Sequence, residues 1–166
     1  MDQYAVFGNP IAHSKSPDIH TAFAAQTGEQ LNYTKQRIVE DGFAEAAREF
    51  LGGEGRGLNI TVPFKLDAFA LADQLTERAQ TAGAVNTLKR LEDGSILGDN
   101  TDGQGMVSDI IDNQGWSIEG KRVLILGAGG AVRGVLHPVL AQNPELVAIA
   151  NRTASKAADL ADVFSA

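Results

Sequence analysis

The chain has 166 residues, with 14 lysine and arginine residues against 21 aspartate and glutamate residues, and a formal net charge of −7. Such an acidic balance argues against binding to a nucleic-acid backbone, so any anionic ligand must be held by a local group of basic residues. The absence of cysteine rules out disulfides, and three scattered histidines argue against a metal centre.

Nothing in the sequence indicates a membrane or an export route. No apolar run reaches the length of a membrane span, and the acidic start Met1-Asp2 does not resemble a signal peptide. We therefore expect a cytoplasmic protein that acts on a small molecule as a monomer or a homodimer, without membrane or nucleic-acid partners.

Strand-like apolar runs alternate with helical patterns along the whole chain. The expected strands are residues 4–7, 33–39, 58–62, 84–88, 123–126 and 146–150. The expected helices are residues 19–26, 43–51, 65–72, 106–113, 132–140 and 156–163. This alternation is typical of an α/β protein with a largely parallel sheet.

A domain boundary is expected between about residues 100 and 120, where a turn-rich segment precedes a helix and a new strand. We interpret residues 1–103 as one α/β domain, residues 104–120 as a connecting helix and linker, and residues 121–166 as the start of a second domain. A doubly wound nucleotide fold needs two βαβαβ halves. Residues 121–166 offer one partial half, so we expect a truncated domain with an uncovered sheet edge and apolar helix faces.

Two serines follow the first expected strand. Ser16 before Pro17 is suited to begin a helix as an N-cap, which explains Ser16 without any ligand. Capping does not explain a second hydroxyl at Ser14 beside Lys15. Two hydroxyls in a strand-to-helix loop are suited to hold a polyhydroxylated or carboxylated ligand.

Asn59 and Thr61 are expected to point in one direction, because alternate residues of a strand share a face. Pro63 is then expected to start a helix, which puts Lys65 in the first turn. There the helix dipole disfavours a cation and makes the lysine a candidate acid–base group. The alternative is an exposed lysine whose stem lies over the helix.

Two further polar residues are candidates. Asn86 is expected on a strand, although an asparagine there also serves to cap a turn. Asp102 lies in a turn before a helix, where most aspartates are caps. It becomes a partner for proton transfer only if it meets Lys65 in space, which sequence spacing does not show.

A glycine-rich turn joins the strand at 123–126 to the helix at 132–140. Residues 127–131 (GAGGA) allow a tight turn in which backbone N–H groups approach a pyrophosphate at the helix N-terminus. The fit to the G-x-G-x-x-G pattern is imperfect, since Val132 occupies the third glycine position. The strand before and the helix after favour a nucleotide site over a plain tight turn. Its candidate residues are Gly127, Ala128, Gly129, Gly130 and Ala131.

The end of the strand at 146–150 indicates which cofactor binds. An NAD site places an acid here to accept hydrogen bonds from the ribose 2′-hydroxyl. This chain instead has Asn151, Arg152 and Thr153, with Lys156 behind them, which suits the 2′-phosphate of NADP. The alternative is a capped helix with Arg152 as a solvated charge.

Taken together, these segments resemble the shikimate dehydrogenase family over essentially the whole chain. The resemblance rests on residues 6–10 with 13–17, 59–65, 82–87, 98–103, 127–131 and 151–153, in the family's order. It implies an N-terminal α/β substrate domain with a mostly parallel sheet, followed by the first half of a Rossmann-like NADP-binding domain. It also implies reversible reduction of 3-dehydroshikimate to shikimate with NADPH, in aromatic amino-acid biosynthesis.

The resemblance assigns roles to the candidate residues. Substrate-binding positions fall on Ser14, Ser16, Asn59, Thr61, Lys65, Asn86 and Asp102. Lys65 falls on the catalytic lysine and Asp102 on its partner, while the glycine turn and residues 151–153 fall on the pyrophosphate and 2′-phosphate sites. Because family members continue beyond residue 166, we expect this chain alone to be a poor catalyst.

Three alternatives remain open from the sequence. A quinate/shikimate dehydrogenase is the nearest, although those relatives often prefer NAD, against which Arg152 argues. A methylenetetrahydrofolate-type dehydrogenase shares the architecture but not the Ser-Lys-Ser block. A sensor that binds a ring acid without turnover has no need of both Lys65 and Asp102.

Overall fold

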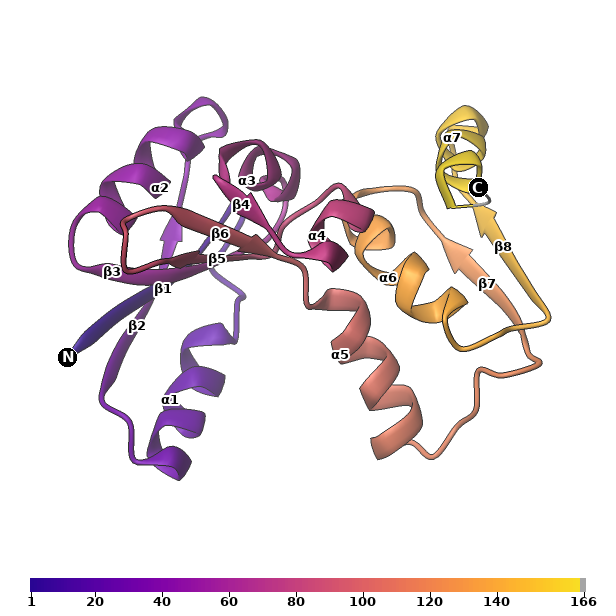
Figure 1. The fold of residues 1–166 in the computed structure, drawn as a ribbon, viewed down its shortest axis with the longest axis horizontal. Helices are drawn as coiled ribbons and strands as arrows, with labels where there is room; N and C mark the ends of the chain where they lie inside the picture. The colour runs from indigo at the N-terminus through magenta and orange to yellow at the C-terminus, as the bar shows by residue number, and fades with distance from the viewer. Residues whose placement is uncertain (165–166) are drawn as a thin grey trace. The chain divides into compact units, whose positions relative to one another are not determined.

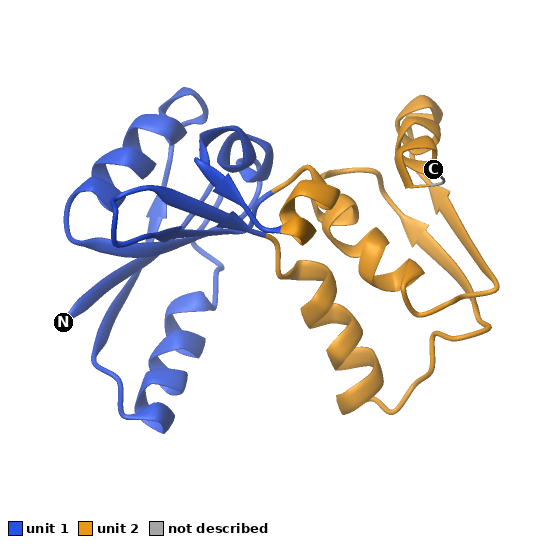
Figure 2. Cartoon of the chain, in the orientation of Figure 1, with its two compact units in different colours: residues 1–76, 85–99 blue, residues 77–84, 100–166 orange. Residues whose placement is uncertain are grey.

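The computed structural model describes residues 1–164 (Figure 1). The chain forms two compact units (Figure 2). Unit 1 comprises Met1–Thr76 and Val85–Asp99, and unit 2 comprises Glu77–Ala84 and the chain from Asn100 onward. Within residues 1–164, no helix is both long and apolar enough to span a bilayer.

Unit 1 is built on a six-stranded sheet. Its strands are β1 (Asp2–Gly8), β2 (Leu31–Arg37), β3 (Gly55–Ile60), β4 (Gln74–Leu75), β5 (Thr87–Arg90) and β6 (Ile96–Asp99), in the order β2-β1-β3-β5-β6-β4. Only β5 runs antiparallel to its neighbours. The α/β class and the largely parallel sheet are thus confirmed.

The two faces of this sheet differ in chemistry. β1 and β3 are aligned so that Phe7 and Ile60 share one face while Tyr4, Val6 and Asn59 share the other. Helices α2 (Phe43–Gly52) and α3 (Lys65–Leu71) lie on one side of the sheet and α1 (Ser16–Thr27) on the other (Figure 1). Phe7 meets Phe50 of α2 edge to face, so the apolar face is the one that α2 covers.

The centre of the unit 1 core is aromatic. Phe43 at the start of α2 stacks on Phe64, with ring centroids 5.0 Å apart and an interplanar angle of 16°. Both side chains are buried, as are Ala47 and Leu51, which follow Phe43 at intervals of four on the same face of α2. This packing fixes the turn that leads into Lys65.

Several predicted boundaries are wrong by a few residues, and each matters for a candidate residue. β5 begins at Thr87 rather than at 84, so Asn86 precedes the strand. The helix expected at 65–72 is confirmed as α3 from Lys65, so Pro63 precedes it rather than starting it. Val62, expected to share a face with buried Ile60, is 63% exposed. The helix expected at 106–113 begins earlier, as α5 (Asp102–Ser108), and continues as a π-helical turn, Asp109–Asn113.

Four short elements were missed altogether. They are the 3-10 helix η1 (Glu40–Gly42), α4 (Glu77–Ala82), β4 and β6, with three, six, two and four residues. None is long enough to show a helical or alternating pattern, and Gly98 interrupts the apolar run of β6. Gly98 is required there because an added Cβ would meet Ala72 Cβ at 2.8 Å.

Unit 2 contains a parallel pair of strands and three longer helices. The strands are β7 (Arg122–Leu126) and β8 (Leu146–Ala150), and the helices are α5, α6 (Gly130–Leu140) and α7 (Ala154–Phe164). Val107 of α5, Val139 of α6 and Ile118 form a buried cluster, against which Val123 and Val147 pack. One face of the strand pair is therefore covered by helices.

The other face of the β7–β8 pair is bare. Leu124 and Leu126 are 63% and 76% exposed, and Leu146 is 45% exposed. These residues alternate with the half-buried valines and isoleucines of the covered face. An exposed apolar strip of this kind favours association with another surface.

Helices α5 and α6 approach each other unusually closely. A Cβ added at Gly103 would collide with the backbone of Gly134 and Val135. A Cβ added at Gly134 would come within 2.7 Å of the Asn100 Oδ1 atom. Glycine at both positions is what allows this crossing.

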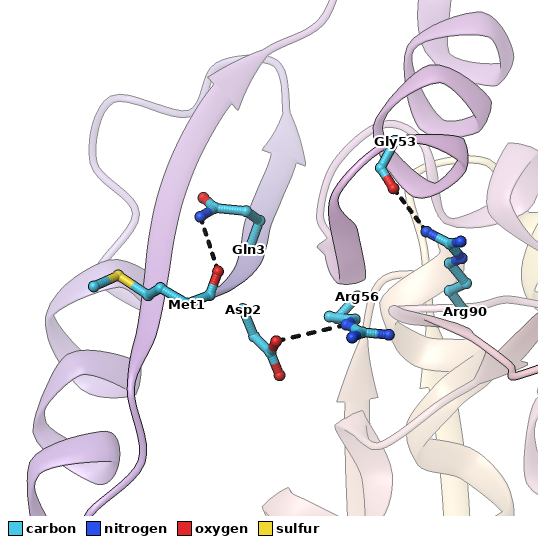
Figure 3. A network of polar contacts seen from close by, with 6 residues as sticks. All are labelled: Met1, Asp2, Gln3, Gly53, Arg56 and Arg90. Carbon is cyan, nitrogen blue, oxygen red and sulfur yellow. Dashed lines mark hydrogen bonds and ion pairs between the residues drawn. The ribbon is translucent and has the colours of Figure 1, made fainter.

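The end of the unit 1 sheet at which β1 and β3 begin carries exposed polar contacts (Figure 3). Arg56 lies 3.6 Å from the Asp2 carboxylate, with side chains 61% and 55% exposed. Arg90 donates to the Gly53 carbonyl oxygen at 2.7 Å. Contacts this exposed contribute little to stability, and none of them involves a predicted site residue.

Candidate functional site

The two serines of the first loop are joined by a hydrogen bond. Ser14 Oγ lies 3.2 Å from Ser16 Oγ, and the Ser16 backbone N–H donates to Ser14 Oγ at 3.3 Å. The N-cap position of α1 is Lys15, and no side chain caps the helix. The expectation that Ser16 serves as the N-cap is therefore wrong, because its hydroxyl takes part in a different network.

That network crosses the sheet through Tyr33. The Tyr33 hydroxyl hydrogen-bonds with Ser16 and donates to Asn59 Oδ1 at 2.6 Å. Tyr33 lies on β2 and Asn59 on β3, two strands apart, and the register puts both on the face that α1 covers. The length of the tyrosine side chain allows it to reach across β1.

The network continues to the start of β5. Asn59 Nδ2 donates to Thr87 Oγ1 at 3.3 Å, and Thr87 Oγ1 donates to Asn86 Oδ1 at 2.8 Å. Asn86 is 8% exposed and its backbone is held on both sides, by Ile60 N–H and by the Asp99 carbonyl. Four predicted substrate residues, Ser14, Ser16, Asn59 and Asn86, are thus linked in one chain of hydrogen bonds.

Burial sets the protonation of the two rings beside this chain. Burial raises the pKa of Tyr33 to about 12, against the opposing effect of the Ser16 hydrogen bond. His20 stacks on Tyr33, with centroids 4.5 Å apart and an angle of 5°. Burial lowers the pKa of His20, while its hydrogen bond with Asn59 acts in the opposite direction. At neutral pH both rings are therefore uncharged.

Thr61 and Lys65 lie just beyond β3. The Thr61 N–H donates to the Phe7 carbonyl at 2.9 Å, and its methyl group packs so closely on Gly8 that no side chain would fit there. Lys65 is half-buried at the first residue of α3, and its carbonyl accepts from Val85 N–H at 2.9 Å. This bond brings the backbone of Lys65 next to the segment that carries Asn86.

Asp102 is the first residue of α5 and belongs to unit 2, whereas Lys65 belongs to unit 1. The N-cap of α5 is Thr101, and no side-chain hydrogen bond caps the helix, so the capping role expected for Asp102 is not observed. Asn100, which is 3% exposed, precedes the cap. Asn100 Oδ1 accepts from the Asp102 N–H at 3.1 Å, and its Nδ2 donates to the Ala84 carbonyl at 2.9 Å, which holds the turn into the helix.

A cavity of about 560 Å³ lies on the face of the unit 1 sheet that α1 covers. His20, Tyr33, Asn59 and Thr87 are in its wall. Ser14, Ser16, Thr61 and Lys65 are not, so this cavity and the predicted substrate residues overlap only at Asn59. The cavity lies beside the hydrogen-bond chain and does not outline the predicted site.

The glycine turn of unit 2 has the geometry of an anion site. Gly127 follows β7 with φ of 120°, a conformation that favours glycine, and its N–H donates to the Ala150 carbonyl at 2.7 Å. Gly129 is the N-cap of α6 without a side-chain cap, and the first turn contains no acid. The backbone N–H groups at residues 128–131 can therefore meet a phosphate.

The second cofactor segment lies at the same edge of this strand pair. β7 and β8 are parallel and pair Leu126 with Ala150, so residues 127–131 and 151–153 leave the sheet side by side. Asn151 Nδ2 donates to the Thr153 carbonyl at 2.8 Å and holds the turn into α7. Arg152 and Lys156 are exposed. Within residues 1–164, no three metal-ligating side chains converge.

Three residues of the network were missed by sequence reasoning. The sequence marks Tyr33 only as the start of an apolar strand, and it does not single out Thr87 or His20. A signal existed for Thr87, since Asn86-Thr87 repeats the amide-plus-hydroxyl pairing of Asn59 and Thr61. No local pattern marks Tyr33 or His20, because their partners lie on strands distant in sequence.

Two family models match the chain. Residues 6–88 match the substrate-binding domain of shikimate dehydrogenase, and residues 109–166 match shikimate/quinate 5-dehydrogenase. These two segments contain every predicted site residue except Asp102.

Individual relatives agree with the family models. The chain is 64% identical over 163 residues to the NADP(+) shikimate dehydrogenase of Cellvibrio japonicus. That match covers 98% of this chain and 59% of the relative, so the chain spans about three-fifths of its length.

Solved structures show the same fold. An Ael1 enzyme from Pseudomonas putida is 48% identical with a TM-score of 0.91. The match covers 100% of this chain and 61% of the Ael1 chain. Shikimate 5-dehydrogenase from Thermus thermophilus, in complex with NADP(H) and shikimate, is 34% identical with a TM-score of 0.90. This match covers 99% of this chain and 61% of the Thermus thermophilus chain. The chain belongs to the shikimate dehydrogenase family.

Proposed function

We propose that this protein catalyses the reversible, NADPH-dependent reduction of 3-dehydroshikimate to shikimate. The observation that carries the proposal is the hydrogen-bond chain that joins four of the predicted substrate residues. It arranges hydroxyls and amides from three separate segments, as recognition of a ring with several hydroxyls and a carboxylate requires. The name of the relatives and the ligands of the Thermus thermophilus structure support the same reaction.

In this proposal Lys65 is the proton donor. Hydride reaches the ring carbonyl carbon from NADPH, and Lys65 Nζ gives a proton to the carbonyl oxygen, which becomes the hydroxyl; the steps reverse for oxidation. Asp102 orients Lys65 and the reacting hydroxyl. Ser14, Ser16, Asn59, Thr61 and Asn86 bind the other hydroxyls and the carboxylate.

The proposed cofactor is NADP. The glycine turn at 127–131 would bind the pyrophosphate through backbone N–H groups at the start of α6. Arg152, with Thr153 and Lys156, would bind the 2′-phosphate, while Asn151 holds the turn. When bound, NADPH would supply the hydride, and the residues named here would bind and orient the cofactor.

Substrate binding and cofactor binding are proposed for different domains. We propose residues 1–103 as the substrate domain, 104–120 as the connection and 121–166 as part of a Rossmann-like NADP domain. The two family-model matches, at 6–88 and 109–166, support two such parts, while residues 77–84 and 100–103 belong to compact unit 2. We further propose cytoplasmic action on small molecules, as a monomer or a homodimer; the net charge of −7 supports small molecules rather than nucleic acid as partners.

The test begins with reduction of NADP⁺ in the presence of shikimate, with quinate and NAD⁺ as comparators. We expect selectivity for shikimate and NADP⁺, and a loss of about 10²–10⁴-fold in turnover for Lys65→Ala, the range found for acid–base groups. Lys89→Ala, at an exposed lysine of β5, is the matched control and should retain turnover.

Ligand binding tests the proposed substrate and cofactor where turnover by this chain is too slow to measure. Shikimate should bind saturably and perturb amide signals of residues 14–16, 59–65 and 86. Arg152→Ala should weaken NADP⁺ binding about tenfold, the effect of one charge-assisted hydrogen bond, and leave NAD⁺ binding unchanged. Arg122→Ala, at an exposed arginine of β7, is the control. Failure of shikimate to bind at all would refute the proposal.

A further inference from the structure

The hydrogen bonds of the unit 1 chain all point the same way. Tyr33 is half-buried and its pKa is raised to about 12, so the hydroxyl keeps its hydrogen at neutral pH and donates it to Asn59 Oδ1 at 2.6 Å. The amide of Asn59 then donates from Nδ2 to Thr87 Oγ1. Having accepted, the Thr87 hydroxyl donates its own hydrogen to Asn86 Oδ1. The order runs from Tyr33 to Asn59, Thr87 and Asn86.

This order matters because an amide can bind in either of two orientations. The oxygen and nitrogen of an asparagine side chain have nearly the same shape, so only hydrogen-bond partners decide which end faces which group. Donation by Tyr33 fixes the oxygen end of Asn59.

Tyr33 is the residue on which this order depends. Its hydroxyl connects Ser14 and Ser16 on one side to the two asparagines on the other. His20 stacks on the ring and holds it in place. A phenylalanine would fill the same space and keep the stack, but would provide no donor for Asn59 Oδ1.

We propose that Tyr33 is a positioning residue of the substrate site, which fixes the amide orientation of both Asn59 and Asn86 through this one-way hydrogen-bond chain. The consequence for recognition rests on the proposed function. Asn59 Oδ1 accepts from Tyr33 and Asn86 Oδ1 accepts from Thr87, so both amides turn their N–H groups away from these donors, and one Asn59 N–H goes to Thr87. The site is thereby matched to ligand oxygens that accept hydrogen bonds, as those of hydroxyls and a carboxylate do.

The first arm of the test needs no ligand. In Tyr33→Phe, the side-chain NH₂ signals of Asn59 and Asn86 should both move in ¹⁵N–¹H NMR spectra. Asn86 lies three hydrogen bonds from the altered hydroxyl, so a merely structural role for Tyr33 would not move its signals selectively. Tyr4→Phe makes the same chemical change on the same sheet face, next to Tyr33 in register, and should leave both pairs of signals in place.

The second arm measures shikimate binding in a double-mutant cycle. Tyr33→Phe should weaken binding about tenfold, the factor that corresponds to one hydrogen bond of ordinary strength. In an Asn59→Ala background the same substitution should have a much smaller effect, because Tyr33 acts through Asn59. Equal effects in both backgrounds would overturn the inference.

The outcomes separate this inference from the function on which it rests. Unmoved Asn86 signals in Tyr33→Phe overturn the positioning role whether or not shikimate binds. Wild-type protein that does not bind shikimate refutes the proposed function, while the side-chain NH₂ signals still decide the role of Tyr33. Unfolding of Tyr33→Phe is checked in the same spectra through the backbone signals of β1 and β3.

Discussion

The two compact units differ in how their apolar residues are covered. In unit 1, the α2 side of the sheet is packed by Phe7, Phe43 and Phe64, each no more than 2% exposed. In unit 2, one face of the β7–β8 pair packs on helices while Leu124 and Leu126 on the other face lie in water. The apolar face of the unit 1 sheet is thus covered by helices, whereas one apolar face of the β7–β8 pair is not.

The candidate sites of the two units differ in which groups would bind the ligand. The site in unit 1 consists of side chains fixed by hydrogen bonds between distant strands, which requires a well-packed sheet behind them. The site in unit 2 consists of backbone N–H groups in a glycine turn, with Arg152 and Lys156 exposed. A side-chain site therefore depends on tertiary packing, while a backbone anion site depends mainly on one strand–turn–helix segment.

The largest effect is expected in the aromatic core of unit 1. Phe64→Ala removes a fully buried ring that stacks on Phe43, and should lower the free energy of unfolding by about 3–5 kcal/mol. Urea titration followed by circular dichroism measures this loss. Phe23→Ala, at a ring that is 55% exposed, is the control. Similar losses for both would mean that unit 1 has no well-packed core.

The next prediction compares two leucines of unit 2. Leu136 of α6 is 1% exposed, and Leu136→Ala should lower the free energy of unfolding by about 2–5 kcal/mol. Leu126→Ala, at a residue 76% exposed, should change stability by no more than about 0.5 kcal/mol and reduce self-association. A large loss of stability at Leu126, measured by the same urea titration, would show that the bare face is covered in solution.

A smaller effect is expected where α5 crosses α6. Gly103→Ala forces a Cβ into the backbone of Gly134 and should cost about 1–3 kcal/mol, as overpacking does. Gly105→Ala, in the same helix with open space around it, should instead stabilise the protein by about 0.4–1 kcal/mol. Thermal unfolding of the two variants gives opposite shifts in Tm if the close crossing is real.

The smallest predicted effect is a pH dependence in unit 1. Because burial lowers the pKa of His20 below 6.5, the folded protein takes up this proton less readily than the unfolded chain. The contribution of neutral His20 to stability is therefore complete above pH 6.5 and is lost as the pH falls toward the folded-state pKa. His20→Gln should flatten the decline of Tm below pH 6.5, and His13→Gln, at an exposed histidine, should not. Identical profiles for the two variants would contradict the burial of His20.

Elements with a long pattern were predictable from the sequence, and short ones were not. The amphipathic spacing of α2 and the continuous apolar runs of β7 and β8 are visible in single segments, so these three elements were predicted within two residues. The helix α4 and the strand β4, with six and two residues, form only because neighbouring segments pair with them or pack on them. The start of β5 was misplaced for the same reason.

By itself the sequence determined which residue types are available for the site and where each follows a strand. Residues were identified as candidates where helix capping and core packing did not account for them, as at Ser14, Asn59, Lys65 and the glycine turn. The contacts between segments follow only from the tertiary structure: Ser16 does not cap α1, Asn100 accepts from the Asp102 N–H, and Tyr33 links the serines to the asparagines. The physical reason is that a side-chain hydrogen bond depends on which strands lie together and in what register, and no local pattern encodes the register of β2, β1 and β3.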